Sequence, residues 1–218
     1  MARLPVATDA AQLSLDSATR TIIPSTRVCR VHLFRHAMVV GAEERRCRGQ
    51  ADVQLSDLGR VQTAAAAVRW PGPYDRVYSS DLSRCSTLGA ALGGPLELTP
   101  RLREQDMGAW DGDTWAELTQ RDGPGTTAYW DDYVNARPPG GESYGEVYTR
   151  VNEFFKVEAP EGVVAVVTHI GCIRALLCGW LGLGAGEALR WAPGYASHTE
   201  VLLADAGAVI VRFGETAY

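Results

Sequence analysis

The sequence has no long hydrophobic segment, and its few cysteines form no paired motif. Its apolar runs, such as residues 163–167, are far shorter than the roughly 20 residues that cross a bilayer. The five cysteines are odd in number and include no Cys-x-x-Cys pair, so neither a zinc module nor a disulfide framework is expected. We therefore expect no membrane partner, and free thiols in a reducing cytoplasm.

An excess of basic charge is also missing. The 218 residues carry 21 basic and 26 acidic side chains, which gives a formal net charge of −5. Proteins that coat nucleic acids usually have a basic surface, so no nucleic-acid partner is expected. Hydrophobic residues make up 46% and charged residues 22%, which is typical of a folded protein. A local basic cluster can still bind a small phosphate, so an anionic substrate remains compatible with this charge.

The first 27 residues differ in composition from the rest of the chain. They lack the apolar centre of a signal peptide and are rich in alanine, serine, threonine and aspartate. We expect residues 1–27 to be an N-terminal extension, either loosely attached or partly packed on the domain. Residues 28–218 are expected to form a single domain, and the oligomeric state is left open between a monomer and a homodimer.

Strand-like and helix-like segments alternate from residue 28 onward. Strands are predicted over residues 28–34, 75–79, 95–99, 163–168, 199–204 and 208–213. Helices are predicted over residues 54–70, 81–92, 143–158 and 171–183, with Ser56 and Ser143 as N-caps of the first and third. This order predicts an α/β fold: a single three-layer domain with a mostly parallel sheet and helices on both faces. Functional sites of such sheets gather at the carboxyl ends of the strands.

Two histidines directly follow predicted strands and so belong to that edge. Arg35-His36 comes after the strand at residues 28–34, and His169 comes after the strand at residues 163–168. A neutral imidazole can attack phosphorus and form a phosphohistidine. A neighbouring guanidinium can bind phosphate oxygens and makes protonation of the imidazole less favourable. Each histidine also has a structural alternative, as a hydrogen-bonded residue of the core.

Two further residues supply groups that suit the same chemistry. Arg84 lies in the first turn of the helix predicted at residues 81–92, where free backbone amides attract anions. Its structural alternative is a surface pair with Asp81. Glu104 lies before the segment Gly108-Ala109-Trp110-Asp111-Gly112. A carboxylic acid in partly apolar surroundings can donate a proton to a leaving alkoxide, whereas the alternative is an ordinary exposed glutamate.

Taken in order, these segments resemble the histidine phosphatase superfamily, the phosphoglycerate-mutase-like proteins. The resemblance rests on Arg35-His36-Ala37, on residues 49–52 with 55–60, on residues 80–87, on residues 102–112 and on residues 168–171. It spans roughly residues 28–213. The ordered set is much more specific than any single block.

The resemblance implies a metal-independent phosphomonoester hydrolase that works through a phosphohistidine intermediate. His36 would be the nucleophile, and Arg35, Arg84 and His169 would bind the phosphate. Glu104 would donate a proton to the leaving group and later activate water, so that His36, Glu104 and His169 are the catalytic residues. No metal and no cofactor is implied, because cationic side chains supply the electrostatic stabilisation.

The sequence departs from the family pattern beside the nucleophile. Val39 and Ala42 stand where many members place a hydroxyl and an asparagine on the phosphate. Arg45, Arg46 and Arg48 follow closely, so one of them could replace these polar ligands, or all three could form a solvated basic loop. The expected substrate contacts are Arg48, Gln50, Trp110 and Ile170.

The segment at residues 101–141 bears on the reaction. It carries Trp130-Asp131-Asp132-Tyr133 and lacks the cationic pair that mutases of the family use to bind a second anion. Such an acidic and aromatic roof would favour hydrolysis of a small phosphorylated metabolite with a neutral or aromatic leaving group. Residues 137–143 resemble the Pro-x-Gly-Gly-Glu-Ser segment of α-ribazole phosphatases, which suggests α-ribazole phosphate or a sugar phosphate as the substrate. Glu142 and Ser143 also fit a helix cap. Phosphoglycerate mutase activity and a weakly active phosphate- or phosphoprotein-binding module remain alternatives.

Overall fold

Branched apolar residues build the two central strands of the sheet. In β4 (Val163–Thr168), every residue after the first is buried. It pairs in parallel with β1 (Val28–Arg35), and Arg35 lies opposite Thr168 in the register. A strand with two buried faces needs such a continuous apolar run, which explains why the sequence predicted it correctly.

The full sheet has six strands in the order β3-β2-β4-β1-β5-β6. The other strands are β2 (Arg76–Ser80), β3 (Leu96–Thr99), β5 (His198–Ala204) and β6 (Gly207–Glu215). The first four strands of this order are parallel, and β5 is antiparallel to both of its neighbours. The prediction of a mostly parallel sheet is therefore confirmed, with an antiparallel hairpin closing one edge.

This computed structural model describes residues 28–205 and 207–217. The predicted N-terminal extension, residues 1–27, lies outside the described residues, and the domain boundary at residue 28 stays a prediction. No helix in the described part of the chain is long and apolar enough to cross a membrane.

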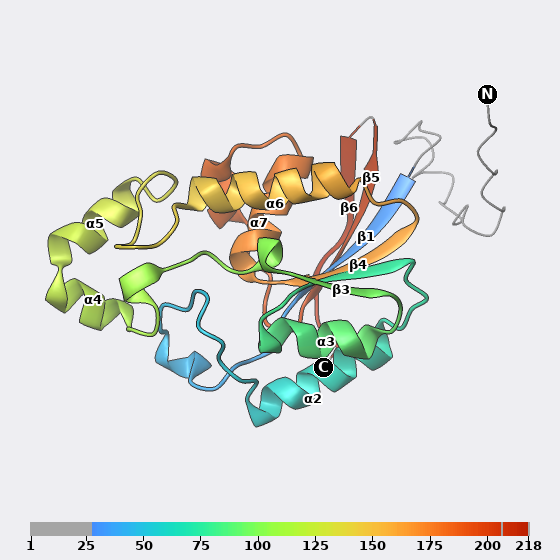
Figure 1. Ribbon diagram of the computed structural model, residues 1–218, viewed down its shortest axis with the longest axis horizontal. Coiled ribbons are helices and arrows are strands. Elements are labelled where there is room, and N and C mark those ends of the chain that lie inside the picture. Colours follow the sequence, from blue (N-terminus) through green and yellow to red (C-terminus); the bar gives the residue numbers. More distant parts are fainter. Residues whose placement is uncertain (1–27, 206, 218) are drawn as a thin grey trace.

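Helices cover both faces of the sheet, as Figure 1 shows. One face carries α2 (Asp57–Arg69) and α3 (Ser83–Leu92), and the other carries α6 (Tyr144–Glu158) and α7 (Ile170–Trp180). Two predicted helices begin later than expected, at residue 57 instead of 54 and at residue 83 instead of 81. The Ser56 hydroxyl accepts a hydrogen bond from the Gly59 amide at 3.0 Å, which fixes the start of α2 at the expected cap.

Alternating side chains of the strands supply two separate hydrophobic cores. Val31 and Leu33 of β1 join the core under α6 and α7. Phe34 of β1 joins Ala165 and Val167 of β4 in the core under α2 and α3. The two cores hold the sheet between the helical layers, and the three-layer fold class is thereby confirmed.

An insert with its own small core stands beside the sheet. Helices α4 (Trp115–Arg121) and α5 (Gly123–Asp131) extend away from the layers in Figure 1. The insert packs around a cluster of buried side chains: Cys47, Met107, Trp110, Leu118 and Tyr129. Short 3-10 helices complete the chain, η2 (Ala42–Glu44), η3 (Pro100–Leu102), η4 (Gly108–Trp110) and η5 (Ala185–Arg190).

The parallel strands place the residues singled out from the sequence at one edge. His36 follows β1 and His169 follows β4, and the His36 amide donates to the Thr168 carbonyl at 3.0 Å. Ser80 ends the next parallel strand, β2. Because the carboxyl ends of neighbouring parallel strands lie together, these three side chains meet at the same end of the sheet.

Candidate active site

His36 is a buried histidine, and one nitrogen of its imidazole ring already forms a hydrogen bond. Its side chain is 6% exposed, and Nδ1 lies 2.8 Å from the Ala37 carbonyl oxygen. A carbonyl only accepts, so Nδ1 carries the hydrogen and Nε2 keeps its lone pair. Burial, with Arg84 and Arg35 nearby, holds the pKa of His36 well below its ordinary value. The ring is therefore neutral, with Nε2 available as a nucleophile.

His169 lies next to His36 and is fully buried. The two ring centroids are 5.1 Å apart. Its Nδ1 accepts a hydrogen bond from Arg84 Nε at 3.3 Å, and its Nε2 lies 2.9 Å from the Ser80 hydroxyl. Nε2 therefore carries the hydrogen and donates it to Ser80. Burial, with His36 and Arg84 nearby, lowers the pKa of His169 well below its usual value.

Arg84 is held at the cavity by the loop that precedes α2. Its two Nη groups donate to the Ala51 carbonyl at 2.8 Å and the Gly49 carbonyl at 2.7 Å. The side chain is 2% exposed, and Asp81 pairs with Arg103 instead of with Arg84. The surface pair weighed from the sequence therefore does not form. Each Nη group carries a second hydrogen, so Arg84 can still donate to a phosphate.

Arg35 is fixed by the loop before β5. Its Nη1 donates to the Pro193 carbonyl at 2.9 Å, and its guanidinium carbon lies 3.9 Å from the centre of the Tyr195 ring. Its Nε is buried and has no hydrogen-bond partner among the described residues. A buried donor without a partner is costly, so a bound anion here would satisfy it.

Glu104 reaches the same cavity from the segment after β3. It is 8% exposed, and its carboxylate accepts hydrogen bonds from the Gln105 amide at 3.0 Å and the Gly171 amide at 3.2 Å. A Cβ at position 171 would lie 2.2 Å from Glu104 Oε1, so only glycine leaves room for this approach. Both amides fix the carboxyl group, and the exposed alternative weighed for Glu104 is wrong.

These side chains line one cavity of about 310 Å³. Its lining residues come from the ends of β1 and β4, the loop after β1, α3, the segment after β3 and the loop before β5: Arg35, His36, Val39, Ala42, Arg45, Arg46, Arg48, Arg84, Glu104, His169, Ile170 and Tyr195. A neutral imidazole, two guanidiniums and a carboxyl group thus face a space of the size that binds a small molecule. This arrangement suits transfer of a phosphoryl group to His36.

Comparison with known proteins identifies the family. A family model described as the histidine phosphatase superfamily, branch 1, matches residues 31–216. The chain belongs to this superfamily. The resemblance of the motifs is thereby confirmed over nearly the whole described part of the chain.

Several curated relatives of this histidine phosphatase are themselves named as phosphatases. It is 36% identical over 172 residues to a glucosyl-3-phosphoglycerate phosphatase of Mycolicibacterium vanbaalenii, with 72% of this chain and 76% of that protein covered. It is 32% identical over 199 residues to a protein of the same name from Mycobacterium tuberculosis, with 77% and 89% covered. A bifunctional protein of Mycobacterium tuberculosis is 34% identical, and the chain spans 46% of its length.

Solved structures share the fold. The α-ribazole phosphatase from Shigella flexneri superposes with a TM-score of 0.79 at 20% identity, covering 85% of this chain and 96% of that one. A mycobacterial glucosyl-3-phosphoglycerate phosphatase superposes with a TM-score of 0.74 at 28% identity, covering 87% and 100%. The first of these likenesses bears on the fold alone.

The expected substrate contacts of the histidine phosphatase fall into two groups. Arg48 and Ile170 line the cavity. Gln50 instead donates from Nε2 to the Glu104 carbonyl at 3.3 Å, which supports the backbone of the acid. Trp110 is 4% exposed and packs against Tyr129, with ring centroids 5.2 Å apart, and it is not among the lining residues. Their roles toward substrate stay predictions.

The acidic and aromatic roof expected over the cavity is not part of its wall. Trp130 is 50% exposed on α5, and the Tyr133 ring stacks on Tyr144 at 4.8 Å instead. Of the described residues that line the cavity, Glu104 alone carries a carboxylate. The insert folds around its own core, so its acids lie outside the cavity lining. The preference for a neutral or aromatic leaving group that was argued from this roof therefore has no support in the cavity lining.

Tyr195 lines the cavity although no motif in the sequence indicated it. Its ring lies under Arg35, and its centroid is 5.6 Å from that of His36. It lies in the loop before β5, outside every motif, and reaches the cavity because β5 pairs with β1. A strand pairing between residues far apart in the chain leaves no local pattern from which Tyr195 could have been predicted.

The carboxylates near Glu104 have structural partners. Asp111 accepts the amides of Gly49 at 2.9 Å and Ala51 at 2.8 Å, and Asp106 accepts the Gly108 amide at 2.9 Å. Asp111 thus holds the loop whose carbonyls orient Arg84. Neither residue lines the cavity, so Glu104 is the carboxyl group placed to reach a substrate there.

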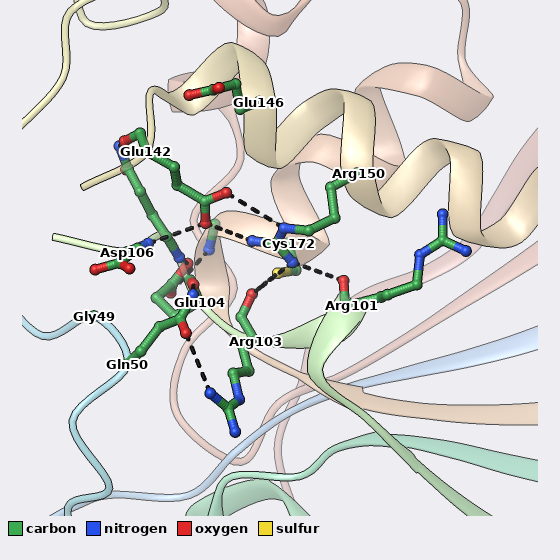
Figure 2. A network of polar contacts seen from close by, with 12 residues as sticks. Gly49, Gln50, Arg101, Arg103, Glu104, Asp106, Glu142, Glu146, Arg150 and Cys172 are labelled. Atoms are coloured by element: carbon green, nitrogen blue, oxygen red, sulfur yellow. Dashed lines mark hydrogen bonds and ion pairs between the residues drawn. The ribbon is translucent and has the colours of Figure 1, made fainter. Parts of the chain in front are cut away.

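Glu142 and Arg150 hold the backbone that carries Glu104, as Figure 2 shows. Arg150 Nη1 donates to the Arg101 carbonyl at 2.7 Å and to the Arg103 carbonyl at 3.1 Å, and its Nη2 lies 2.6 Å from Glu142 Oε1. Glu142 Oε1 also accepts the Asp106 amide at 3.0 Å. The helix cap weighed for this segment is confirmed at Ser143, and the acid of the capping box is Glu146, so Glu142 is left to pair with Arg150.

Removal of the Arg150 guanidinium is expected to loosen this segment. Arg150→Met should lower the free energy of unfolding by about 2 kcal/mol, since hydrogen bonds to charged groups are lost and Glu142 keeps its charge without its partner. Arg137→Met is the matched control, because Arg137 forms a more exposed ion pair with Glu146 at the start of α6. The control should cost less than about 1 kcal/mol. Urea denaturation of both variants measures the difference, and equal losses would contradict it.

Proposed function

We propose that this protein hydrolyses phosphomonoesters of small metabolites through a phosphohistidine intermediate. The observation that carries the proposal is the neutral His36 ring, with Nε2 unprotonated, in one cavity with Arg35, Arg84 and Glu104. Relatives named as glucosyl-3-phosphoglycerate phosphatases support a phosphorylated sugar derivative as the substrate.

In the first step, His36 Nε2 attacks phosphorus while the ester oxygen leaves. The phosphoryl group would lie between the guanidiniums of Arg35 and Arg84, and His169 would add a further contact. These groups favour the charge that spreads over the phosphoryl oxygens. Glu104 gives its proton to the leaving oxygen, so the products are an alcohol and phosphorylated His36.

In the second step, water replaces His36 on the phosphoryl group. The Glu104 carboxylate, which lost its proton in the first step, takes a proton from the attacking water. The oxygen of water bonds to phosphorus as the phosphorus–nitrogen bond breaks. Inorganic phosphate is released, and both His36 and Glu104 return to their starting states.

In this mechanism, arginine side chains supply the positive charge that stabilises the phosphoryl oxygens, and we propose that no metal takes part. Among residues 28–205 and 207–217, no group of three or more His, Cys, Asp or Glu side chains is arranged to hold a metal ion. EDTA should therefore leave the rate of phosphate release unchanged. A loss of activity that EDTA causes and that Mg²⁺ or Zn²⁺ restores would contradict this prediction.

A panel of phosphorylated metabolites with detection of free phosphate tests the proposed hydrolysis directly. Release of phosphate from p-nitrophenyl phosphate separates an enzyme from a phosphate-binding module, because binding alone releases nothing. Recovery of label on 2-phosphoglycerate from labelled 3-phosphoglycerate would instead show mutase activity. Phosphate released from no compound of the panel would contradict the proposed function.

We also propose a cytoplasmic location. All five cysteines are buried and free, as expected in a reducing compartment. The cavity formed by the described residues supports a small phosphorylated substrate as the binding partner.

A further inference from the structure

We propose that residues 41–48, here called the arginine loop, form a second anion subsite in which Arg45 binds a carboxylate of the substrate. The inference rests on the proposed function and deepens it. It names the substrate class as small phosphomonoesters that carry a carboxylate or a comparable anionic group on the leaving part. The arguments are the charge on the cavity wall, the contacts of the arginines and the space beyond the phosphate.

The cavity holds more positive charge than one phosphate group uses. Arg35 and Arg84 lie beside His36, and the arginine loop adds Arg45, Arg46 and Arg48 to the wall. Against these five guanidiniums stands the single carboxyl group of Glu104. Arg46 already forms ion pairs with Glu44 and Glu117, so a phosphate dianion seated between Arg35 and Arg84 leaves the charges of Arg45 and Arg48 without an anionic partner on the substrate. A second anion on the same molecule would compensate it.

Two arginines of the loop are engaged in holding its shape. Arg48 Nη2 donates to the carbonyls of Val40 at 2.9 Å and Gly41 at 3.0 Å. Arg46 Nη1 donates to the Gly112 carbonyl at 2.8 Å, and its guanidinium also forms ion pairs with Glu44 and Glu117. These contacts anchor the loop to its own backbone and to the segment after Trp110. They use Arg46 as a structural group, whereas Arg48 keeps a buried Nε that has no hydrogen-bond partner among the described residues.

Arg45 is the arginine of the loop whose entire guanidinium remains available to a ligand. It is the C-cap of η2, and its backbone angles of φ 51° and ψ 41° lie in the left-handed region that residues other than glycine rarely adopt. Its guanidinium has no hydrogen bond or ion pair with any other described residue. The contacts of Arg46 and Arg48 on either side fix this backbone, and the Arg45 side chain lines the cavity.

The apolar residues near the arginine loop explain why the second group of the substrate would be a charged group and not a hydroxyl. Val39 and Ala42, which stand where many family members place a hydroxyl and an asparagine, line the cavity, and their side chains offer no hydrogen bonds to a sugar or an alcohol. The volume of about 310 Å³ leaves space for a small leaving group beside the phosphate. Selectivity on this side therefore comes from charge.

Two matched substrate pairs test the subsite. The first pair is 3-phosphoglycerate and glycerol 3-phosphate, in which a hydroxymethyl group replaces the carboxylate. The second pair is 4-carboxyphenyl phosphate and phenyl phosphate, in which the carboxylate lies farther from the phosphorus. We expect kcat/KM of the wild type to favour the carboxylate in at least one pair. Arg45→Gln should reduce that preference about ten- to a hundredfold, the worth of a charge-assisted hydrogen bond.

The control is Arg190→Gln, which removes an exposed arginine that pairs with Glu187 and does not line the cavity. It should leave both preferences as in the wild type. Preferences that are the same in the wild type and in Arg45→Gln for both pairs would overturn the subsite, even when hydrolysis itself is fast.

Calorimetry separates this inference from the proposed function. The His36→Asn variant, which lacks the nucleophile, should bind 3-phosphoglycerate or 4-carboxyphenyl phosphate more tightly than its uncharged counterpart. The double variant with Arg45→Gln should lose that difference. Preferential binding without hydrolysis by the wild type would contradict the proposed function and support the subsite. Equal affinities within both pairs would overturn the subsite.

Discussion

Replacement of His36 by alanine is expected to lower phosphate release by about 10⁴- to 10⁶-fold, as for other enzymes that lose their nucleophile. The ring that alanine removes is the one with an unprotonated Nε2, beside Arg35 and Arg84. No other described histidine in the cavity can replace it directly, because both ring nitrogens of His169 already have partners. The loss should appear in kcat/KM for every substrate of the panel.

The same variant tests the intermediate. Wild-type protein quenched during turnover of a ³²P-labelled substrate should carry acid-labile label, as a phosphohistidine does, and His36→Ala should carry none. His32→Gln is the control, because His32 lies on the same strand, outside the cavity lining, and contacts His198 at 2.9 Å. Turnover of wild-type size in His36→Ala, or label that resists acid, would contradict the nucleophile assignment.

Replacement of Glu104 by glutamine should produce a loss that depends on the leaving group. Hydrolysis of alkyl phosphates should slow by about 10²- to 10⁴-fold, the usual contribution of general acid–base catalysis. Hydrolysis of p-nitrophenyl phosphate should slow less, since p-nitrophenolate leaves with little help from an acid. Glutamine is close in shape to glutamate, but Gln105 donates to Oε1 and Gly171 to Oε2, so the variant keeps the acceptor of only one of these amides.

The ratio of the two losses is the quantity that decides the role of Glu104. Asp106→Asn is the matched control, because it changes a nearby carboxylate that does not line the cavity, and it should leave the ratio unchanged. Equal losses on both substrates would point to activation of water or to positioning. No loss on either substrate would remove Glu104 from the mechanism.

The contacts around Glu104 also explain why its backbone is so firmly held. A general acid acts only when its proton lies within hydrogen-bond reach of the leaving oxygen. The Glu142–Arg150 pair holds the Arg103 carbonyl before this residue and the Asp106 amide after it, and Gly171 admits its carboxyl group. The Gly-Gly-Glu-Ser segment, which suggested a substrate from the sequence, therefore has a structural use that is independent of any substrate.

The sequence by itself determined the order of the elements and the position of the two histidines proposed for the reaction. Residues 163–168 are mostly apolar and branched, and such a run is typical of a strand that is buried on both faces. A residue that follows a parallel strand lies at the carboxyl edge of the sheet. His36 and His169 were therefore placed correctly from local pattern alone.

The sequence also gave the identity of the charged groups but not their partners. Arg84 in the first turn of a helix predicts a group near an anion. Nothing local shows that Gly49 and Ala51, more than 30 residues earlier, would orient its guanidinium. Hydrogen bonds between distant segments arise only when the chain is folded, so the Asp81 alternative could not be excluded beforehand.

Only the tertiary structure decided what the cavity wall contains. The aromatic and acidic residues of the insert were expected to cover the cavity. Instead, Tyr129 and Trp110 are buried in the separate core of the insert. Composition does not report the direction in which a helix turns its apolar face. Tyr195 entered the site because β5 pairs with β1, and Arg45 because the arginine loop is anchored on both sides of it. Side-chain direction and the pairing of remote strands are set by packing, and packing is a property of the whole chain.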